Sequence, residues 1–309
     1  MSILANYPLW KHSTLRAGGA AERFAVARTV DELAALAEGG PITVVGGGSN
    51  ILPSDDGVPG LVVLNRSSAI QVDGETVTVD TGVPLQEVFL RTAQAGLSGL
   101  QYAVGIPGSV GGALVSNAGA YRSNISEVVT GLEVVKDGVR HWAEPSVMGF
   151  SYRDSVLRSA TPPRLVTLRA RFQLKRRSRQ EIFEEARDFQ RQRISKQPPQ
   201  ASAGSFFKNV ADVALAQEIP GLSEGMRKAG VIPAGFLLEQ VGMKGYRLGG
   251  AGFGRKHANF MLNLGGATAT EIRSLAQLGA RRVRERFGVE LEAEVLYLGD
   301  WTGFVAISG

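Results

Sequence analysis

The sequence predicts an α+β protein with more than one domain. Its 309 residues are enough for two or three hydrophobic cores. Apolar residues recur with a period of two in some segments and of about 3.6 in others, which predicts strands and helices in alternation. The 39 glycines gather in a few runs instead of spreading evenly, which indicates segments whose backbone is a contact surface.

The N-terminal segment predicts a strand over 22–30. Thr29 and Glu32 then match a capping box, which opens a helix that ends at Gly39-Gly40. An apolar strand follows and runs directly into the glycine run at 46–50. A strand that ends in three glycines predicts a tight turn, and one of its possible uses is to hold a phosphate.

Strands, hairpins and one helix fill most of the chain up to residue 178. The segments 61–66 and 164–174 predict strands, and 70–82 predicts a hairpin. A second hairpin turns at Asp137-Gly138, a dipeptide typical of two-residue turns. A helix is expected over 84–96, with an inward stripe formed by Leu85, Val88, Phe89 and Thr92.

The C-terminal part predicts two longer helices and a final strand. The first helix follows the basic residues at 175–177, which we interpret as a solvated turn, and places Ile182, Ala186 and Phe189 inward. Thr268 and Glu271 form a second capping box, and that helix ends near Gly288. Its inward stripe comprises Ile272, Leu275, Ala276, Gly279 and Val283. A strand over 289–298 is expected to carry Glu290, Glu292 and Glu294 on one face.

The stretch 92–121 contains no charged residue, and a run of this length first suggests a membrane span. Seven glycines and Pro107 argue against that, because they make a poor helix and would leave amides unsatisfied in lipid. We interpret the run as a backbone surface for a large, partly apolar ligand that carries phosphates. A side chain added at Gly111 is expected to project against that ligand.

Composition narrows the classes of function. The absence of cysteine excludes disulfides and thiolate chemistry, and three scattered histidines (His12, His141 and His257) predict no metal site. The first ten residues lack the basic and apolar regions of a signal peptide, so a cytoplasmic protein is expected. The net charge of +5 is compatible with an anionic ligand, while nothing predicts a nucleic-acid partner or a membrane.

Five ordered motifs resemble the UDP-N-acetylenolpyruvoylglucosamine reductase family. They are VVGGGSNIL, GIPGSVGGALVSNAGAY, GSFFKN, LLEQVGMKG and LEAEV. The resemblance implies an FAD-binding fold of the vanillyl-alcohol-oxidase type in two lobes, at 1–66 and 67–178. It further implies a substrate domain at 179–288 and a C-terminal strand at 289–309. The chain is similar to the family's shorter second subgroup, which lacks a lid tyrosine, and Val210 replaces the proline usual there.

The resemblance also implies roles for individual residues. Arg153, Ser205 and Glu294 match catalytic positions, and Asn209, Gln240, Arg193 and Lys196 match substrate contacts. FAD, bound without a covalent bond, is expected at Gly46, Gly47, Gly48, Ser49, Asn50, Gly105, Ile106, Pro107, Gly108, Ser109, Gly111, Gly112, Asn117 and Gly119. NADPH is the expected hydride donor and UDP-N-acetylglucosamine enolpyruvate the expected substrate. The product, UDP-N-acetylmuramate, is a peptidoglycan precursor. No oligomeric state is predicted.

The residue types suit that chemistry, but each has a plainer interpretation. Arg153 presents paired donors to a planar carboxylate, and it could instead pair with Asp154. Ser205 could donate a proton or be a loop hydroxyl, and Glu294 could be a solvated strand residue. Two other functions stay open: a different FAD-dependent oxidoreductase of the same fold, and a non-catalytic module that binds nucleotide sugars.

Overall fold

The computed structural model describes residues 2–196, 198, 200 and 202–307. The chain divides into two compact units. Unit 1 comprises Met1–Tyr7, Ala21–Gly48 and Val58–Ser195, and unit 2 comprises Pro8–Ala20, Ser49–Gly57 and Lys196–Gly309. Two short N-terminal segments are therefore built into the unit that holds the C-terminal part, while the predicted four-part division stays a prediction.

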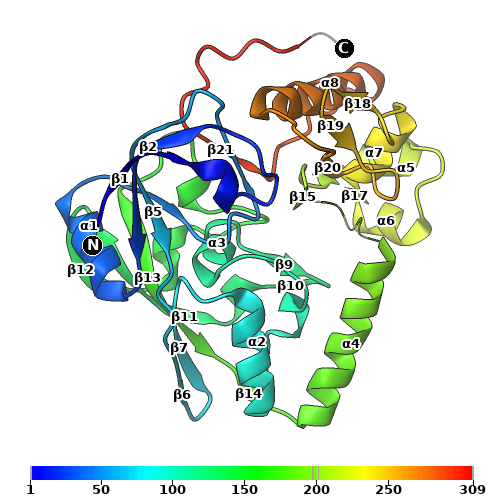
Figure 1. Ribbon diagram of the computed structural model, residues 1–309. Coiled ribbons are helices and arrows are strands. Elements are labelled where there is room, and N and C mark those ends of the chain that lie inside the picture. Colours follow the sequence, from blue (N-terminus) through cyan, green and yellow to red (C-terminus); the bar gives the residue numbers. More distant parts are fainter. Residues whose placement is uncertain (1, 197, 199, 201, 308–309) are drawn as a thin grey trace. The chain divides into compact units, whose positions relative to one another are not determined.

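Unit 1 contains most of the strands (Figure 1). Its strands are β1 (Leu4–Pro8), β2 (Ala20–Ala27), β3 (Thr43–Val45), β5 (Val58–Asn65), β6 (Ile70–Asp73), β7 (Thr76–Asp80), β8 (Leu97–Ser98), β9 (Gly119–Ala120), β10 (Ser123–Asn124), β11 (Val129–Lys136), β12 (Val139–Ala143), β13 (Leu165–Gln173) and β14 (Lys175–Arg176). Its α-helices are α1 (Val30–Gly39), α2 (Leu85–Gln94), α3 (Val110–Val115) and α4 (Arg179–Lys196).

The first sheet of unit 1 has the strand order β1-β2-β5-β3, and β5 runs parallel to both β2 and β3. Helix α1 connects β2 to β3 and begins with the predicted capping box between Thr29 and Glu32. Leu33, Ala34 and Ala37 of this helix lie in a buried cluster with residues of β2 and β5. The predicted strand and helix are thus confirmed, with the strand beginning two residues earlier.

The second sheet of unit 1 is antiparallel, with the order β12-β11-β13-β7-β6. Its hairpin turns at Asp137-Gly138, where both residues have positive φ (50° and 82°), as a two-residue turn of type I′ requires. Helices α2 and α3 share the buried core of this sheet, and all four residues of the predicted α2 stripe are buried. Both predicted hairpins are therefore confirmed.

Unit 2 is built around one core. Its strands are β4 (Ile51–Pro53), β15 (Ser202–Ser205), β16 (Val210–Ala211), β17 (Val231–Ile232), β18 (Arg247–Leu248), β19 (Ala251–Phe253), β20 (Phe260–Asn263) and β21 (Leu296–Leu298). Its α-helices are α5 (Val213–Glu218), α6 (Glu224–Ala229), α7 (Ala234–Gln240) and α8 (Ala269–Phe287). A four-stranded antiparallel sheet has the order β15-β20-β19-β18.

The segment Ser49–Gly57 belongs to unit 2 because of specific bonds. Strand β4 pairs in parallel with β21, and the carboxylate of Asp55 accepts hydrogen bonds from the amides of Ala269 and Thr270 at 2.9 and 2.7 Å. Those amides begin helix α8, so Asp55 caps it from outside the helix, beside the predicted capping box. The predicted inward stripe of α8 is buried throughout.

One predicted element is wrong in extent. The expected strand over 289–298 is regular only in β21, and before it Ala293 forms an isolated bridge with Phe207. Glu290 pairs instead with Arg284 at 3.3 Å. Leu291 and Val295 are buried and Glu290 and Glu292 are exposed, as the alternation predicts, but among the described residues regular pairing here is confined to β21 with β4. Among the described residues, no helix is long and apolar enough to cross a membrane.

Candidate active site

The two glycine runs meet inside unit 1. A Cβ added to Gly47 would lie 2.7 Å from the Cα of Gly108, and one added to Gly46 would collide with the hydroxyl of Ser109. Contacts this short leave no room for a side chain, so the first run needs glycine at 46 and 47 for the two backbones to approach each other. The structure therefore brings together two segments that lie about sixty positions apart in the sequence.

The joined runs present backbone that a ligand can reach. Gly47 and Gly105 are exposed, and Gly108 has a φ of 111°, which favours glycine. Within the part of the chain that the structure describes, the amides of Gly47, Gly105 and Gly108 donate no hydrogen bond. Unpaired amides of this kind suit the phosphate oxygens of a dinucleotide such as FAD.

Some residues of these two glycine runs make structural contacts within the protein. The Ser109 hydroxyl is buried and accepts a hydrogen bond from the Gly112 amide, so it caps helix α3. A Cβ added at Gly111 would lie 3.2 Å from Thr81, a residue of the protein core. A side chain at Gly111 would therefore point toward Thr81 in the core of the protein. The expectation that it projects against the ligand is wrong.

Arg153 lies at the corner of a tight turn. Ser151 and Asp154 pair through two backbone hydrogen bonds of 3.2 and 3.3 Å, and Arg153 between them has a φ of 54°. A left-handed conformation is uncommon for a residue with a long side chain, and such strain gathers at functional sites. The Asp154 carboxylate lies 3.6 Å from Arg158.

The end of the second glycine run holds this turn in place. The Arg153 guanidinium donates a hydrogen bond to the Gly119 carbonyl. The Asn117 amide group donates to the Ser151 carbonyl at 2.8 Å, and the Asn117 oxygen accepts from the Ser126 amide at 3.3 Å. Asn117 and Gly119, both predicted to contact FAD, therefore also position the predicted catalytic arginine.

Ser205 and Glu294 lie on adjacent segments of unit 2. The Glu294 amide donates a 2.8 Å hydrogen bond to the carbonyl of Phe206, the residue after Ser205. Asn50, at the end of the first glycine run, donates from its side chain to the Glu294 carbonyl at 2.9 Å. Both Ser205 and Glu294 are half-buried, so Glu294 is not a fully solvated strand residue.

Asn259 is a residue that the sequence interpretation missed. It is buried, with 2% of its surface exposed, and its side chain bonds both backbone groups of Phe207, at 2.9 and 2.8 Å. Its carbonyl accepts from the Phe206 amide at 2.7 Å. Asn259 thus fixes the backbone directly after Ser205. Its only sequence signal was a polar residue inside the apolar segment HANFML.

Replacing Asn259 with alanine is expected to lower the free energy of unfolding by about 3 kcal/mol. The change leaves the amide and carbonyl of Phe207 buried without partners, and each such group costs about 1–3 kcal/mol. Urea unfolding would measure the loss. Asn209→Ala is the matched control, because Asn209 is exposed and its side chain accepts one bond, from the Ala234 amide at 3.2 Å. Equal losses in the two variants would contradict the assignment.

The predicted substrate residues lie in different surroundings. Asn209 bonds the start of α7, and the Gln240 carbonyl at its other end accepts a hydrogen bond from Arg286. Because α7 has seven residues, its two ends lie about 9 Å apart. Lys196 is the last residue of α4, and its side chain lies outside the described residues. Arg193 lies in unit 1, beside Gly105.

The structure leaves part of the predicted site as a prediction. Arg153 belongs to unit 1, whereas Ser205 and Glu294 belong to unit 2. Their expected meeting in one pocket therefore stays a prediction.

In the described part of the chain, no group of His, Asp and Glu side chains could hold a metal ion.

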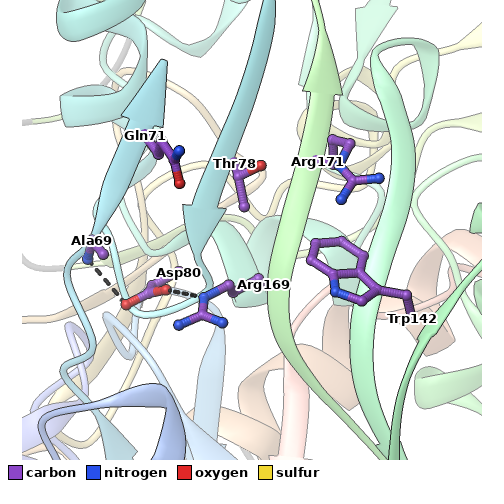
Figure 2. Close-up of a pocket in the computed structure, with 7 residues that line it drawn as sticks. All are labelled: Ala69, Gln71, Thr78, Asp80, Trp142, Arg169 and Arg171. Carbon is purple, nitrogen blue, oxygen red and sulfur yellow. Dashed lines mark hydrogen bonds and ion pairs between the residues drawn. The ribbon is translucent and has the colours of Figure 1, made fainter. Parts of the chain in front are cut away.

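A pocket of about 370 Å³ lies elsewhere, on the five-stranded sheet of unit 1 (Figure 2). It is lined by Ala69, Gln71, Thr78, Asp80, Trp142, Arg169 and Arg171. Arg169 pairs with Asp80 at 3.0 Å and with Glu133 at 2.9 Å, and Figure 2 shows Arg171 facing the Trp142 ring. Ion pairs and a cation–π contact account for these side chains, and none of the predicted site residues lines the pocket.

Comparisons with known proteins agree with this arrangement. Residues 22–140 match an FAD-binding domain, and residues 196–298 match the C-terminal domain of UDP-N-acetylenolpyruvoylglucosamine reductase. The reductase of Rubrobacter xylanophilus is 36% identical over 95% of this chain and 94% of its own. That of Bacillus subtilis is 34% identical over 96% of this chain and 94% of its own.

A solved structure extends the likeness to three dimensions. The crystal structure of UDP-N-acetylenolpyruvylglucosamine reductase from Thermus caldophilus superimposes with a TM-score of 0.76. It is 33% identical, and the match covers 96% of this chain and 98% of the other. Similarity in sequence and fold thus spans both units and includes every predicted motif. The chain therefore belongs to the UDP-N-acetylenolpyruvoylglucosamine reductase family.

Proposed function

We propose that this protein reduces UDP-N-acetylglucosamine enolpyruvate to UDP-N-acetylmuramate, a precursor of peptidoglycan, in the cytoplasm. The observation that carries the proposal is the full-length similarity to the reductases, together with the hydrogen bond from the Glu294 amide to the Phe206 carbonyl, which places Glu294 near Ser205. FAD is the bound cofactor and NADPH the hydride donor. When bound, FAD supplies hydride chemistry, taking hydride from NADPH and giving it to the β-carbon of the enolpyruvyl ether.

The backbone of the two glycine runs is suited to hold FAD. The amides of Gly47, Gly105 and Gly108 are available as donors, and the exposed glycine surface lets a flat or extended ligand approach the main chain. The expected contacts with Ile106, Pro107 and Gly112 are part of this proposal, since the first is half-buried and the other two are exposed.

Arg153 is proposed to orient the substrate carboxylate. Hydride addition at the β-carbon places negative charge on the α-carbon and its carboxylate, and a guanidinium can stabilise that charge through two parallel hydrogen bonds. The strained turn, which Asn117 holds through the Ser151 carbonyl, and the bond from the guanidinium to the Gly119 carbonyl keep the side chain in one orientation. Such preorganisation is most effective where charge develops during the reaction.

Ser205 is proposed to donate the proton that the α-carbon receives. Its neighbours Phe206 and Phe207 are buried, and Asn259 bonds the backbone of Phe207, so the segment that carries the hydroxyl is held in place. Glu294 is held beside Ser205 by the bond to the Phe206 carbonyl, and we assign it to the same site. Asn209, Gln240 and Lys196 are proposed contacts to the nucleotide part of the substrate.

Substrate-dependent consumption of NADPH tests the function. The purified protein should oxidise NADPH only when UDP-N-acetylglucosamine enolpyruvate is present, and the product should gain two hydrogen atoms by mass spectrometry. Oxygen-dependent turnover of another alcohol or sugar would favour a different oxidoreductase of this fold. A colourless protein that cannot be reconstituted with FAD would favour a non-catalytic binding module.

Gly47→Ala is expected to remove most of the bound FAD. The new Cβ would lie 2.7 Å from the Cα of Gly108 and would push the two glycine runs apart. The ratio of flavin absorbance to protein absorbance after purification measures the loss. Gly39→Ala is the matched control, because a Cβ at Gly39 meets nothing within 4 Å. A folded Gly47→Ala protein with full flavin would show that the contact does not form the cofactor site.

A further inference from the structure

Three aromatic rings of the C-terminal segment surround Arg273 of helix α8. The ring centroids of Tyr297, Trp301 and Phe304 lie 4.9, 4.6 and 4.3 Å from its Cζ atom. All three distances are within the roughly 6 Å at which a ring attracts a cation. The rings also pack edge to face on one another, Tyr297 on Trp301 and Trp301 on Phe304, with centroids 5.6 and 5.8 Å apart. We call these four residues the Arg273 cage.

The rings take the place of a counter-ion for Arg273. Its side chain is half-buried, and its Nη1 atom is buried without a hydrogen-bond partner. In the part of the chain that the structure describes, no carboxylate forms an ion pair with it. Burial raises the pKa of Tyr297 to about 12, although the charge of Arg273 opposes the shift, so the phenol is neutral at physiological pH. The cage is therefore held by the attraction of one cation to neutral rings.

Hydrogen bonds place the same segment against α8 and β21. The Ile307 amide donates to the Ser274 hydroxyl of α8 at 3.0 Å, and the Trp301 indole donates to the Leu298 carbonyl of β21 at 3.1 Å. That carbonyl also accepts a bond from the Ser54 amide at 2.8 Å, directly after β4. All of these residues belong to unit 2. The residues that follow β21 thus contact both the helix and the β4–β21 pair.

Tyr297 connects the cage to the residues of the proposed active site. It lies in β21, three positions after Glu294, and its ring packs edge to face on Phe206 with centroids 6.5 Å apart. Phe206 is fully buried, follows Ser205 and accepts the hydrogen bond from the Glu294 amide. One side chain therefore contacts both Arg273 and the segment that carries Ser205.

We propose that Arg273 is a positioning residue for the reduction of the enolpyruvyl substrate. Its charge holds Tyr297, and Tyr297 holds Phe206 and with it the Ser205 hydroxyl. Arg273 touches neither substrate nor FAD and acts through those two rings. A proton donor must lie within about 3 Å of the atom that it serves, so a small displacement of this segment is enough to slow the step. The inference rests on the proposed function of Ser205.

The proposal requires the charge of Arg273 and not merely its volume. Methionine fills a similar length of space, but its thioether attracts a ring more weakly than a desolvated cation does. Lysine has a similar length and keeps the positive charge, so it keeps part of the attraction. Comparing Arg273→Met with Arg273→Lys therefore separates attraction from packing.

Hydrogen exchange of the purified holoenzyme tests the positioning without turnover. In Arg273→Met, the Glu294 amide should exchange at least about tenfold faster than in the parent, because its bond to Phe206 is no longer held by the cage. Amides of the β19–β20 pair, in the same unit, should keep their rates. Arg281→Met is the matched control and should change neither, since Arg281 lies on α8 but is 59% exposed and pairs with Glu285.

Stopped-flow kinetics tests the consequence for the reaction. Arg273→Met should slow the reoxidation of the flavin by substrate about tenfold and leave its reduction by NADPH near the parental rate, as expected when a donor is displaced but not removed. Arg273→Lys should lie closer to the parent in both measurements. Phe304→Leu keeps the charge but lacks the nearest ring, and it should show the same selective changes if Arg273→Met does not fold.

Four results would overturn the proposal. They are a parental exchange rate at Glu294 in folded Arg273→Met, equal acceleration throughout unit 2, normal flavin reoxidation in that variant, and an Arg273→Lys protein as impaired as Arg273→Met. The second would show a general loss of stability, and the last would show that packing matters and not charge. A parent that does not reduce the substrate would refute the proposed function instead, and hydrogen exchange would still test the cage by itself.

Discussion

Ser205→Ala is expected to slow the reduction of the enolpyruvyl substrate by at least about a hundredfold and to leave the reduction of FAD by NADPH near the parental rate. The first half-reaction needs no proton at the α-carbon, so it has no use for the hydroxyl. The second does, and a positioned general acid is worth about 10²–10⁴-fold in rate. Buried Phe206 and Phe207 flank the site, so bulk water is a poor replacement donor.

Stopped-flow absorbance separates the two steps. The loss of flavin absorbance on mixing with NADPH reports the first, and its return on mixing with substrate reports the second. Ser202→Ala is the matched control, since Ser202 lies in the same strand and its hydroxyl accepts a hydrogen bond from the Gly204 amide, at 3.4 Å. Equal slowing of both steps in Ser205→Ala would indicate a structural role. A normal second step would mean that another residue donates the proton.

Arg153→Lys is expected to lower kcat by about 10²-fold or more, the loss seen when one donor to a developing negative charge is removed. An ammonium cannot reproduce two parallel bonds to a planar carboxylate, nor the bond that the guanidinium donates to Gly119. Steady-state kinetics would measure the change. NADPH should still reduce the bound FAD, because that step does not involve the substrate carboxylate.

Arg171→Lys controls for the general effect of exchanging arginine for lysine. Arg171 lies on the exposed sheet face over the Trp142 ring, 4.3 Å from its centroid, and should lose no activity. Thermal unfolding of Arg153→Lys should show that the tight turn at Ser151–Asp154 survives. A folded Arg153→Lys protein with parental kcat would show that the residue does not stabilise charge in the reaction.

Local elements of the fold were predictable because their causes are local. Each capping box requires residues only three positions apart, and the hairpin at Asp137-Gly138 depends on two residues that tolerate positive φ. The inward stripes of α2 and α8 follow from helical periodicity. The strand predicted over 289–298 was wrong in extent for the opposite reason. Which segment pairs with it depends on the whole fold and not on its own residues.

The candidate site was predictable in its residues but not in their connections. The motifs marked Arg153, Ser205 and Glu294, and the glycine runs pointed to backbone contact. The sequence did not indicate that Asn117 holds the Arg153 turn, or that Asn259 fixes the backbone after Ser205. These contacts join residues 34 and 52 positions apart. Polar residues at such distances carry no periodic signal.

The sequence by itself determined the family, the order of the elements and the segments that need glycine. These features could be predicted because ordered motifs, helix caps and periodicity depend only on the order and spacing of residues in the sequence. Tertiary structure alone decided where those segments meet: Gly47 against Gly108, Asn50 beside Glu294, and Arg193 against Gly105. The direction of a Cβ at Gly111, and the neighbours of the half-buried Arg193, depend on how distant segments pack in three dimensions, which no local pattern records.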